Sequence, residues 1–189
     1  MNTILTLAEA IKERRSTRAF SNEKVTEEMI ALLFEAARWA PSAMNEQPWL
    51  YFYAGKDNPD AFNKVLGVLT GINPQWAKDA QYLIVSVARK FYDYNDRQNN
   101  NALHDLGAAN VSLAIQAAHM GLQVRQMGGF DKDKAAELLQ LDRQKFEPVT
   151  IIAVGFPGSA GQLPDELMQR EQAPRMRKPV EEFATQLKF

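Results

Sequence analysis

The chain has 189 residues, of which 46% are hydrophobic and 24% charged, with a formal net charge of −1 and no cysteine. This length favours a single domain, residues 1–189, with a core of its own. The balanced charge excludes nucleic-acid binding driven by bulk charge. The lack of cysteine excludes disulfides and a thiol nucleophile. Two histidines, His104 and His119, are too few and too far apart for a His-rich metal cluster, so we expect no metal.

The N-terminal sequence does not resemble a secretion signal. Its apolar stretch, residues 4–7, is short and is followed by Lys12, Arg14 and Arg15 instead of a cleavage site. No apolar run approaches the ~20 residues that a membrane span needs. We therefore expect a cytoplasmic protein without a membrane partner.

The pattern of apolar residues predicts helices mixed with four strands. We expect helices over about 6–15, 26–39, 59–69, 102–120 and 131–141, and strands over about 49–54, 82–88, 122–127 and 148–156. Thr6 and Glu9 would form a capping box at the first helix. Only the connection between the last two strands has the length of a tight strand–helix–strand unit, so the pattern predicts an α+β fold.

Three segments suggest contacts beyond this core. Along helix 102–120, a small-sided stripe recurs at heptad-like spacing, and another helix could approach it closely. Asn110 on this stripe is either a buried amide with partners or a register-setting contact between subunits. Residues 89–101 are polar with three aromatic side chains, which predicts an irregular loop or lid. Residues 158–189 are poor in core-forming residues, so we expect an extended segment that wraps over a second subunit.

Two clusters of arginine lie near the ends of the chain. Arg14, Arg15 and Arg18 flank Ser16 and Thr17, and a second cluster spans 175–178. Guanidinium forks match phosphate oxygens, and hydroxyls add further donors. Each cluster alone is more typical of a solvated basic surface. If the two ends meet, they form one site for a phosphate dianion.

A third feature is the loop from Pro41 to Pro48, which joins a helix to a strand. Its Asn45 and Gln47 can donate and accept hydrogen bonds at once, which suits the edge of a planar heterocycle, although an ordinary loop is the alternative. The adjacent His104 and Asp105 are more typical of helix capping than of catalysis. The chain contains none of the glycine motifs of Rossmann, P-loop or α/β-hydrolase sites.

In this order, the motifs Arg14–Arg18, Ala40–Trp49 and Arg177–Pro179 resemble the FMN-dependent nitroreductase family, and 73–80 and 105–122 agree. The resemblance covers nearly the whole chain. It implies an α+β homodimer with a central, mostly antiparallel sheet, FMN at the subunit interface and a C-terminal segment that crosses to the partner. NADH or NADPH would pass a hydride through flavin N5 to a nitroaromatic, quinone or enone by a ping-pong mechanism. The flavin is then the reactive centre, and no catalytic residue is assigned.

The resemblance also assigns cofactor-binding residues. Around the FMN phosphate and ribityl chain it places Arg14, Arg15, Ser16, Arg175 and Arg177; along the flavin ring it places Arg18, Asn73, Gly128 and Gly129; from the other subunit it brings Pro41, Ser42, Met44, Asn45 and Gln47. Several family members have an acidic residue at the position of Gly128 and a lysine at that of Trp76, so the flavin surroundings should be tuned differently here. A flavin- or nucleotide-binding protein without turnover stays open as the alternative.

Overall fold

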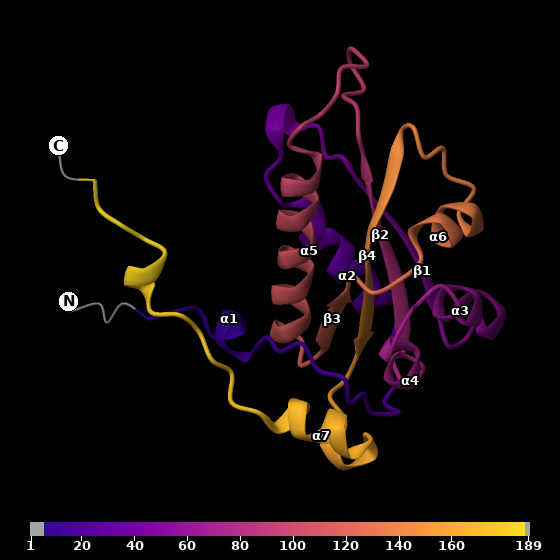
Figure 1. Cartoon of the computed structure of the whole chain (residues 1–189), viewed down its shortest axis with the longest axis vertical. Coiled ribbons are helices and arrows are strands. Elements are labelled where there is room, and N and C mark those ends of the chain that lie inside the picture. The colour runs from indigo at the N-terminus through magenta and orange to yellow at the C-terminus, as the bar shows by residue number, and fades with distance from the viewer. Residues whose placement is uncertain (1–5, 188–189) are drawn as a thin grey trace.

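The computed structural model of the chain describes residues 6–187. Its strands are β1 (Trp49–Gly55), β2 (Tyr82–Arg89), β3 (Gln123–Met127) and β4 (Phe146–Gly155) (Figure 1). Its helices are α1 (Glu9–Glu13), α2 (Glu27–Arg38), α3 (Pro59–Leu66), α4 (Asn73–Ala77), α5 (Ala102–His119), α6 (Lys132–Leu138) and α7 (Asp165–Gln172). Three short 3-10 turns are η1 (Ala43–Asn45), η2 (Ala160–Gln162) and η3 (Val180–Glu182).

The four strands form one sheet in the order β1-β2-β4-β3, and every neighbouring pair is antiparallel. The two inner strands are almost wholly buried because helices cover both faces of the sheet. This arrangement confirms the α+β class and the antiparallel sheet that the family resemblance implies.

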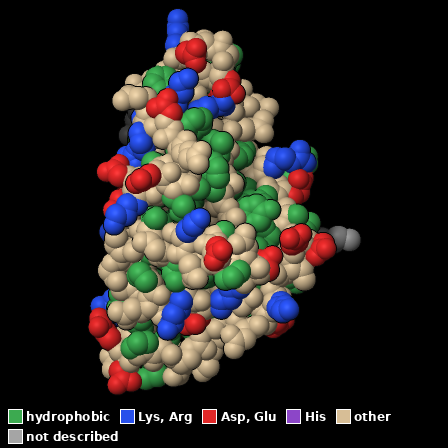
Figure 2. Space-filling view, turned by 90° about the vertical axis from the view of Figure 1, so that its right-hand side faces the viewer, with side chains coloured by type: hydrophobic (Ala, Val, Ile, Leu, Met, Phe, Trp, Pro, Cys, Tyr) green, Lys and Arg blue, Asp and Glu red, His purple; other side chains and the backbone are tan. Residues whose placement is uncertain are grey.

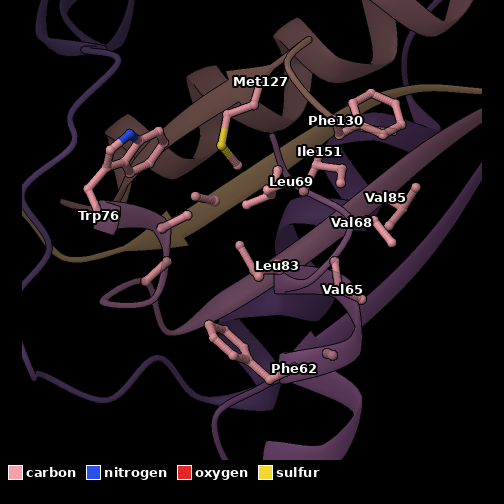
Figure 3. Close-up of a cluster of buried hydrophobic side chains, with 14 of the residues drawn as sticks. Phe62, Val65, Val68, Leu69, Trp76, Leu83, Val85, Met127, Phe130 and Ile151 are labelled. Atoms are coloured by element: carbon pink, nitrogen blue, oxygen red, sulfur yellow. The ribbon is translucent and has the colours of Figure 1, made fainter. Parts of the chain in front are cut away.

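Alternate residues of β2 face two separate cores, as the pleat of a strand requires. Ile84 faces α2 and α5 and packs with Leu33 and Leu113. Leu83 faces the other side, where α3, α4 and the region of α7 contribute Phe62, Trp76 and Leu167 (Figure 3). The helices therefore lie in two layers with the sheet between them (Figure 1).

The small-sided stripe of α5 packs on the chain's own sheet. Leu106, Leu113 and Ala117 are fully buried. The Tyr51 hydroxyl donates to Asn110 Oδ1 at 2.9 Å, and Asn110 Nδ2 donates to Ser86 Oγ at 3.3 Å. Asn110 is thus a buried amide with partners, the first of the two alternatives, and the helix that approaches this stripe is α2 of the same chain.

Several element boundaries differ from the sequence-based expectation. Helix α1 begins after Ala8 and has no side-chain cap, so the capping box of Thr6 and Glu9 is wrong. This helix buries none of its residues, and a local capping signal alone does not fix the start of so short a helix. Helix α3 ends at Leu66, earlier than expected, and the single turn α4 was not expected. The side chains of Thr26 and Asp131 cap α2 and α6, and the cap at Asp131 was expected.

The C-terminal segment has two parts. Its first part is docked, since Leu167 of α7 is fully buried in the core. The extended part starts only after α7 and runs beside the N-terminal segment, away from the sheet (Figure 1). The expected start of the extended segment, at Gly158, is therefore about one helix too early, because two leucines of the tail, Leu163 and Leu167, reach the core.

The packing of α5 predicts the effect of two leucine truncations on the same helix. Leu113 is 0% exposed and Leu103 is 53% exposed. Leu113→Ala should lower the free energy of unfolding by about 2–5 kcal/mol, because it leaves a cavity between α5 and the sheet. Leu103→Ala should change it by less than about 0.5 kcal/mol. Urea unfolding at one fixed protein concentration measures both, and equal losses would contradict the assigned packing.

Candidate functional site

The first basic cluster follows α1 and is held by the start of β3. The backbone N–H of Arg15 donates to Gln123 Oε1 at 2.7 Å, and Gln123 Nε2 donates to the carbonyl of Glu13 at 3.4 Å. One glutamine thus fixes the chain on both sides of Arg14. The arginines are presented from an extended backbone that the edge of the sheet orients.

The second basic cluster lies against the first. Arg175 donates one hydrogen bond to the carbonyl of Arg14 at 2.8 Å and one to the carbonyl of Lys12 at 2.6 Å. The two ends of the chain therefore meet, as the phosphate-site hypothesis requires. Figure 2 shows the side of α3 and α6, where basic and acidic side chains are interspersed.

Arginine dominates a cavity of about 350 Å³ between these segments. Its charged and hydroxyl-bearing lining is Arg14, Arg15, Ser16, Arg18, Arg125, Arg170, Glu171, Arg175 and Arg177. Burial, followed by the charges of Arg177 and Arg175, lowers the pKa of Arg14. A guanidinium still stays protonated at neutral pH. The cavity therefore holds mutually repelling cations, and an anionic ligand would relieve this repulsion.

The single carboxylate in this lining, Glu171, orders the backbone around the arginines. It accepts a hydrogen bond from the hydroxyl of Thr17 and one from the backbone N–H of Arg18 at 3.0 Å. One of its oxygens lies 3.6 Å from the Arg18 guanidinium, and its carbonyl accepts from Arg15 at 3.1 Å. Glu171 was not predicted from the sequence, because nothing in a polar tail distinguishes this glutamate from its neighbours.

A second group of expected residues lies at the carboxyl end of β3. Asn73 Nδ2 donates to the carbonyl of Gly129 at 3.0 Å. A Cβ atom at Gly129 would come within 2.7 Å of the same Asn73 nitrogen, so a side chain at this position would displace the Asn73 amide. Gly128 has open space where a Cβ would be. The backbone at this pair is therefore accessible to a flat ligand.

The third group is the loop around η1, which two carboxylates hold in place. Asp105, buried in the first turn of α5, accepts from the backbone N–H of Ala43 at 3.0 Å and lies 3.1 Å from His104 Nδ1. Asp105 therefore anchors this loop and does not cap its own helix, whose N-cap Asn101 makes no side-chain cap bond. Glu46 bonds the Arg89 guanidinium at 2.6 Å and accepts from the backbone N–H of Asp93 at 2.6 Å.

These anchors hold an unusual backbone. Met44, Asn45 and Gln47 have φ values of 57°, 55° and 50°, in the left-handed region. Such residues cost about 1 kcal/mol or more each and persist where their surroundings hold them. Ser42 Oγ accepts from the backbone N–H of Gln47 at 3.0 Å, and the Gln47 amide donates to Asn45. The Met44 side chain is exposed, so the loop presents it outward after Pro41.

Helix α5 separates this loop from the arginine cavity. Asp105 binds the loop at the first turn of α5, whereas Gln123 binds the arginine segment just after its last turn. The 18 residues of α5 span about 27 Å at ~1.5 Å per residue. Within one chain, the arginines of both ends come together, and Asn73 pairs with Gly129. The residues from Pro41 to Gln47 lie at the other end of α5, away from the arginine cavity (Figure 1).

Two further charged residues at these sites were not predicted from the sequence. Arg125 of β3 lines the arginine cavity and donates to the carbonyl of Ser16. Arg89, at the end of β2, joins Glu46 to the loop that contains Asp93. Both lie in strands whose apolar neighbours predict only a sheet, so no local signal distinguishes them.

Comparison with known proteins identifies the family. A model of the nitroreductase family matches residues 11–156. The chain therefore belongs to the nitroreductase family, which confirms the resemblance drawn from its motifs. Within residues 6–187, no helix combines the length and the apolar character that a membrane span needs. The His, Asp and Glu side chains of the same residues do not gather in threes as a metal site would require.

Individual relatives agree with this assignment. YdgI of Bacillus subtilis (strain 168), provisionally named an NAD(P)H nitroreductase, is 26% identical over 188 residues, which cover 81% of this chain and 89% of YdgI. An iodotyrosine deiodinase of Haliscomenobacter hydrossis is 26% identical over 186 residues, which cover 85% of this chain and 82% of the deiodinase.

Solved structures share the fold. The crystal structure of an oxidoreductase containing FMN matches with a TM-score of 0.90 and 32% identity over 100% of this chain and 95% of that one. A nitroreductase family protein of Streptococcus pneumoniae TIGR4 matches with a TM-score of 0.75 and 20% identity, over 95% and 98% of the two chains.

The anchoring of the η1 loop predicts a difference between two Arg–Glu pairs. The Glu46 and Arg89 side chains are 6% and 20% exposed, whereas the Glu35–Arg38 pair is exposed. Glu46→Ala should lower the free energy of unfolding by about 1.5–3 kcal/mol. The substitution removes hydrogen bonds to a charged carboxylate in a site that is largely shielded from water. The matched control Glu35→Ala should cost about 0–1 kcal/mol. Urea unfolding of both variants measures the difference, and a Glu46 variant as stable as the control would refute the anchoring role.

Proposed function

We propose that residues 1–189 form one FMN-dependent oxidoreductase domain that moves a hydride from NADH or NADPH to a small organic acceptor. The observation that carries this proposal is the arginine cavity built from both ends of a chain of the nitroreductase family. FMN in the similar oxidoreductase supports the choice of cofactor. When bound, FMN supplies a ring that accepts a hydride at N5 and gives it up again.

The residues of the cavity suit FMN. Its phosphate carries about −1.5 to −2 charges at neutral pH, which several guanidiniums and a hydroxyl can bind. Arg14, Ser16, Arg175 and Arg177 would hold this phosphate, and Arg15 the adjoining ribityl chain. The bare backbone at Gly128 and Gly129 lets a planar ring approach closely, with Arg18 and Asn73 at its edge.

We further propose that the protein works as a homodimer, because one chain holds only part of the site. The η1 loop lies at the far end of α5 from the cavity, so Pro41, Ser42, Met44, Asn45 and Gln47 would come from a second copy. Apolar side chains in and just before α1, on the outer face of α5 and on the C-terminal segment support this arrangement. They are exposed in the isolated chain and include Leu7, Ile11, Val111, Val180 and Phe183.

The phosphate part of the proposal predicts the effect of one arginine. Arg177 bonds only its neighbour's carbonyl, at Met176, among the described residues, so its charge is free for a ligand. Arg177→Ala should weaken FMN binding by roughly 2 kcal/mol, about 30-fold, because a charge-assisted contact is lost. Flavin fluorescence titration measures this affinity. Arg143→Ala, which removes an arginine far from the cavity, is the control. If the Arg177 variant bound FMN as tightly as the wild type, Arg177 would not belong to the phosphate site.

The activity is tested by flavin reduction and steady-state kinetics. Under anaerobic conditions, NADH or NADPH should bleach the visible flavin absorption of the FMN-loaded protein. Addition of the acceptor should restore this absorption. Donor and acceptor would use one flavin face in turn. Double-reciprocal plots of initial rate against NADH or NADPH concentration, at several fixed acceptor concentrations, should therefore be parallel.

Each outcome of these measurements has a definite meaning. Flavin that binds but does not bleach would favour the alternative of a binding protein without turnover. Nitroaromatics, quinones and enones, tried as acceptors, identify the acceptor class. Intersecting plots would argue for two separate sites.

A further inference from the structure

A second cavity, of about 930 Å³, lies beside the η1 loop and shares no lining residue with the arginine cavity. Its volume is within the range of pockets that hold small organic ligands. It opens among the η1 loop, the start of β1, the start of β4 and the segment that follows β2. Of the residues proposed to bind FMN, only Gln47 borders it. The cavity is therefore a separate space that adjoins the cofactor loop.

The segment that follows β2 is an ordered hairpin rather than the expected irregular loop. Phe91 forms an isolated β-bridge with Gln98. At the base of the hairpin, the backbone N–H of Lys90 donates to the carbonyl of Lys145 at 2.8 Å, and Lys90 Nζ donates to the carbonyl of Arg143 at 2.6 Å. The hairpin is therefore joined to the residues just before β4, and both line the cavity.

Arg89 joins this hairpin to the η1 loop. Its guanidinium bonds Glu46 of the loop through both the carboxylate, at 2.6 Å, and the carbonyl, at 3.3 Å. The same guanidinium forms an ion pair with Asp93 of the hairpin. Two walls of the cavity are thus held together by carboxylates from two segments. Because these carboxylates compensate the charge of Arg89, it is not available to an anionic ligand.

The lining of the cavity is aromatic and slightly acidic. Its aromatic side chains, on which a flat ring can stack, are Trp49, Phe91, Tyr92 and Phe146. Its charged side chains are the carboxylates Glu46, Asp93 and Asp96 and the cations Arg89 and Lys145. The carboxylates outnumber the cations, in contrast to the arginine cavity. An uncharged planar ring suits this lining, whereas an anion meets an excess of negative charge.

We infer that this cavity binds the acceptor and selects an uncharged aromatic ring over an anionic one. The inference rests on the proposed function, in which the η1 loop of one copy reaches the flavin ring bound by the second copy. Gln47 belongs to that loop and lines the cavity, so the cavity opens beside that ring. The acceptor gains a hydride from the reduced flavin and a proton from solvent, which converts a nitro group to a nitroso group and one water.

The charge preference is tested by binding without turnover. The full-length protein is loaded with oxidised FMN and receives no electron donor. Two matched probes, para-nitrobenzyl alcohol and para-nitrobenzoate, share a nitroaromatic ring and differ in one anionic group. Isothermal titration calorimetry should show that the alcohol binds about tenfold more tightly, because the acidic lining repels the carboxylate. If the benzoate bound as tightly as the alcohol, or more tightly, the inference would be overturned without any variant.

Two tyrosines of the hairpin locate the bound ring. Tyr92 lines the cavity, whereas Tyr94 is 63% exposed and does not line it. Tyr92→Ala should weaken binding of the alcohol about tenfold, because a stacking surface is lost, and Tyr94→Ala should weaken it by less than about twofold. Equal affinities in the two variants would place the ring outside the cavity and overturn the inference.

A third variant tests the charge of the lining. Asp96 has a φ of 52°, which asparagine also tolerates. Asp96→Asn should reduce the preference for the alcohol about threefold, because one carboxylate is neutralised. Asp60→Asn, on α3 and outside the lining, is the control with no expected change. An unchanged preference in the Asp96 variant would overturn the role of the acidic lining.

The outcomes also separate this inference from the proposed function. If FMN binds and NADH or NADPH bleaches it, but the alcohol binds equally well to both tyrosine variants, the acceptor cavity is wrong and the function stands. A wild-type protein that binds no FMN would overturn both.

Discussion

The packing of α5 against the sheet is the constraint on which the site depends. Its apolar face is buried between α2 and the sheet, so its ends are fixed points in the fold. One end holds the η1 loop through Asp105, and the other leads directly to Gln123, which orients the arginine segment. A helix of this length keeps the two groups about 27 Å apart. The proposal that both groups hold one cofactor therefore requires two copies of the chain, with the loop of each reaching the cavity of the other.

Neutral oxygen atoms hold most of the arginines, and this keeps the cavity positively charged. Arg175 bonds the carbonyls of Lys12 and Arg14, Arg125 bonds that of Ser16, and Arg15 bonds that of Glu171. A carbonyl oxygen holds a guanidinium in place without neutralising its charge. A carboxylate would hold the guanidinium and also neutralise its charge. The cations therefore stay available for an anion at the cost of mutual repulsion, and a bound phosphate would stabilise the folded chain by the same interaction.

The sequence predicts what local chemistry determines. Asp131 caps its helix, Gly121 follows α5 with a positive φ, and the apolar runs become β2 and β4. The residues that complete the site were not predictable in this way. Glu171 acts on Thr17 across 154 positions, and Asp105 acts on Ala43 across 62. Such contacts exist only after the sheet has brought distant segments together. The failed capping box at Thr6 shows the converse, because a local signal without buried contacts does not set a boundary.

A mixed dimer tests the shared site most directly. One chain carries Arg177→Ala and keeps its loop, while a differently tagged chain keeps Arg177 and carries Asn45→Ala with Gln47→Ala. If the site is shared, the purified heterodimer contains one intact site and should bind one FMN per two chains with nearly wild-type affinity, whereas each parent homodimer binds weakly. A heterodimer that binds FMN no more tightly than its parents would show that all the contacts come from one chain, which contradicts a site divided by α5.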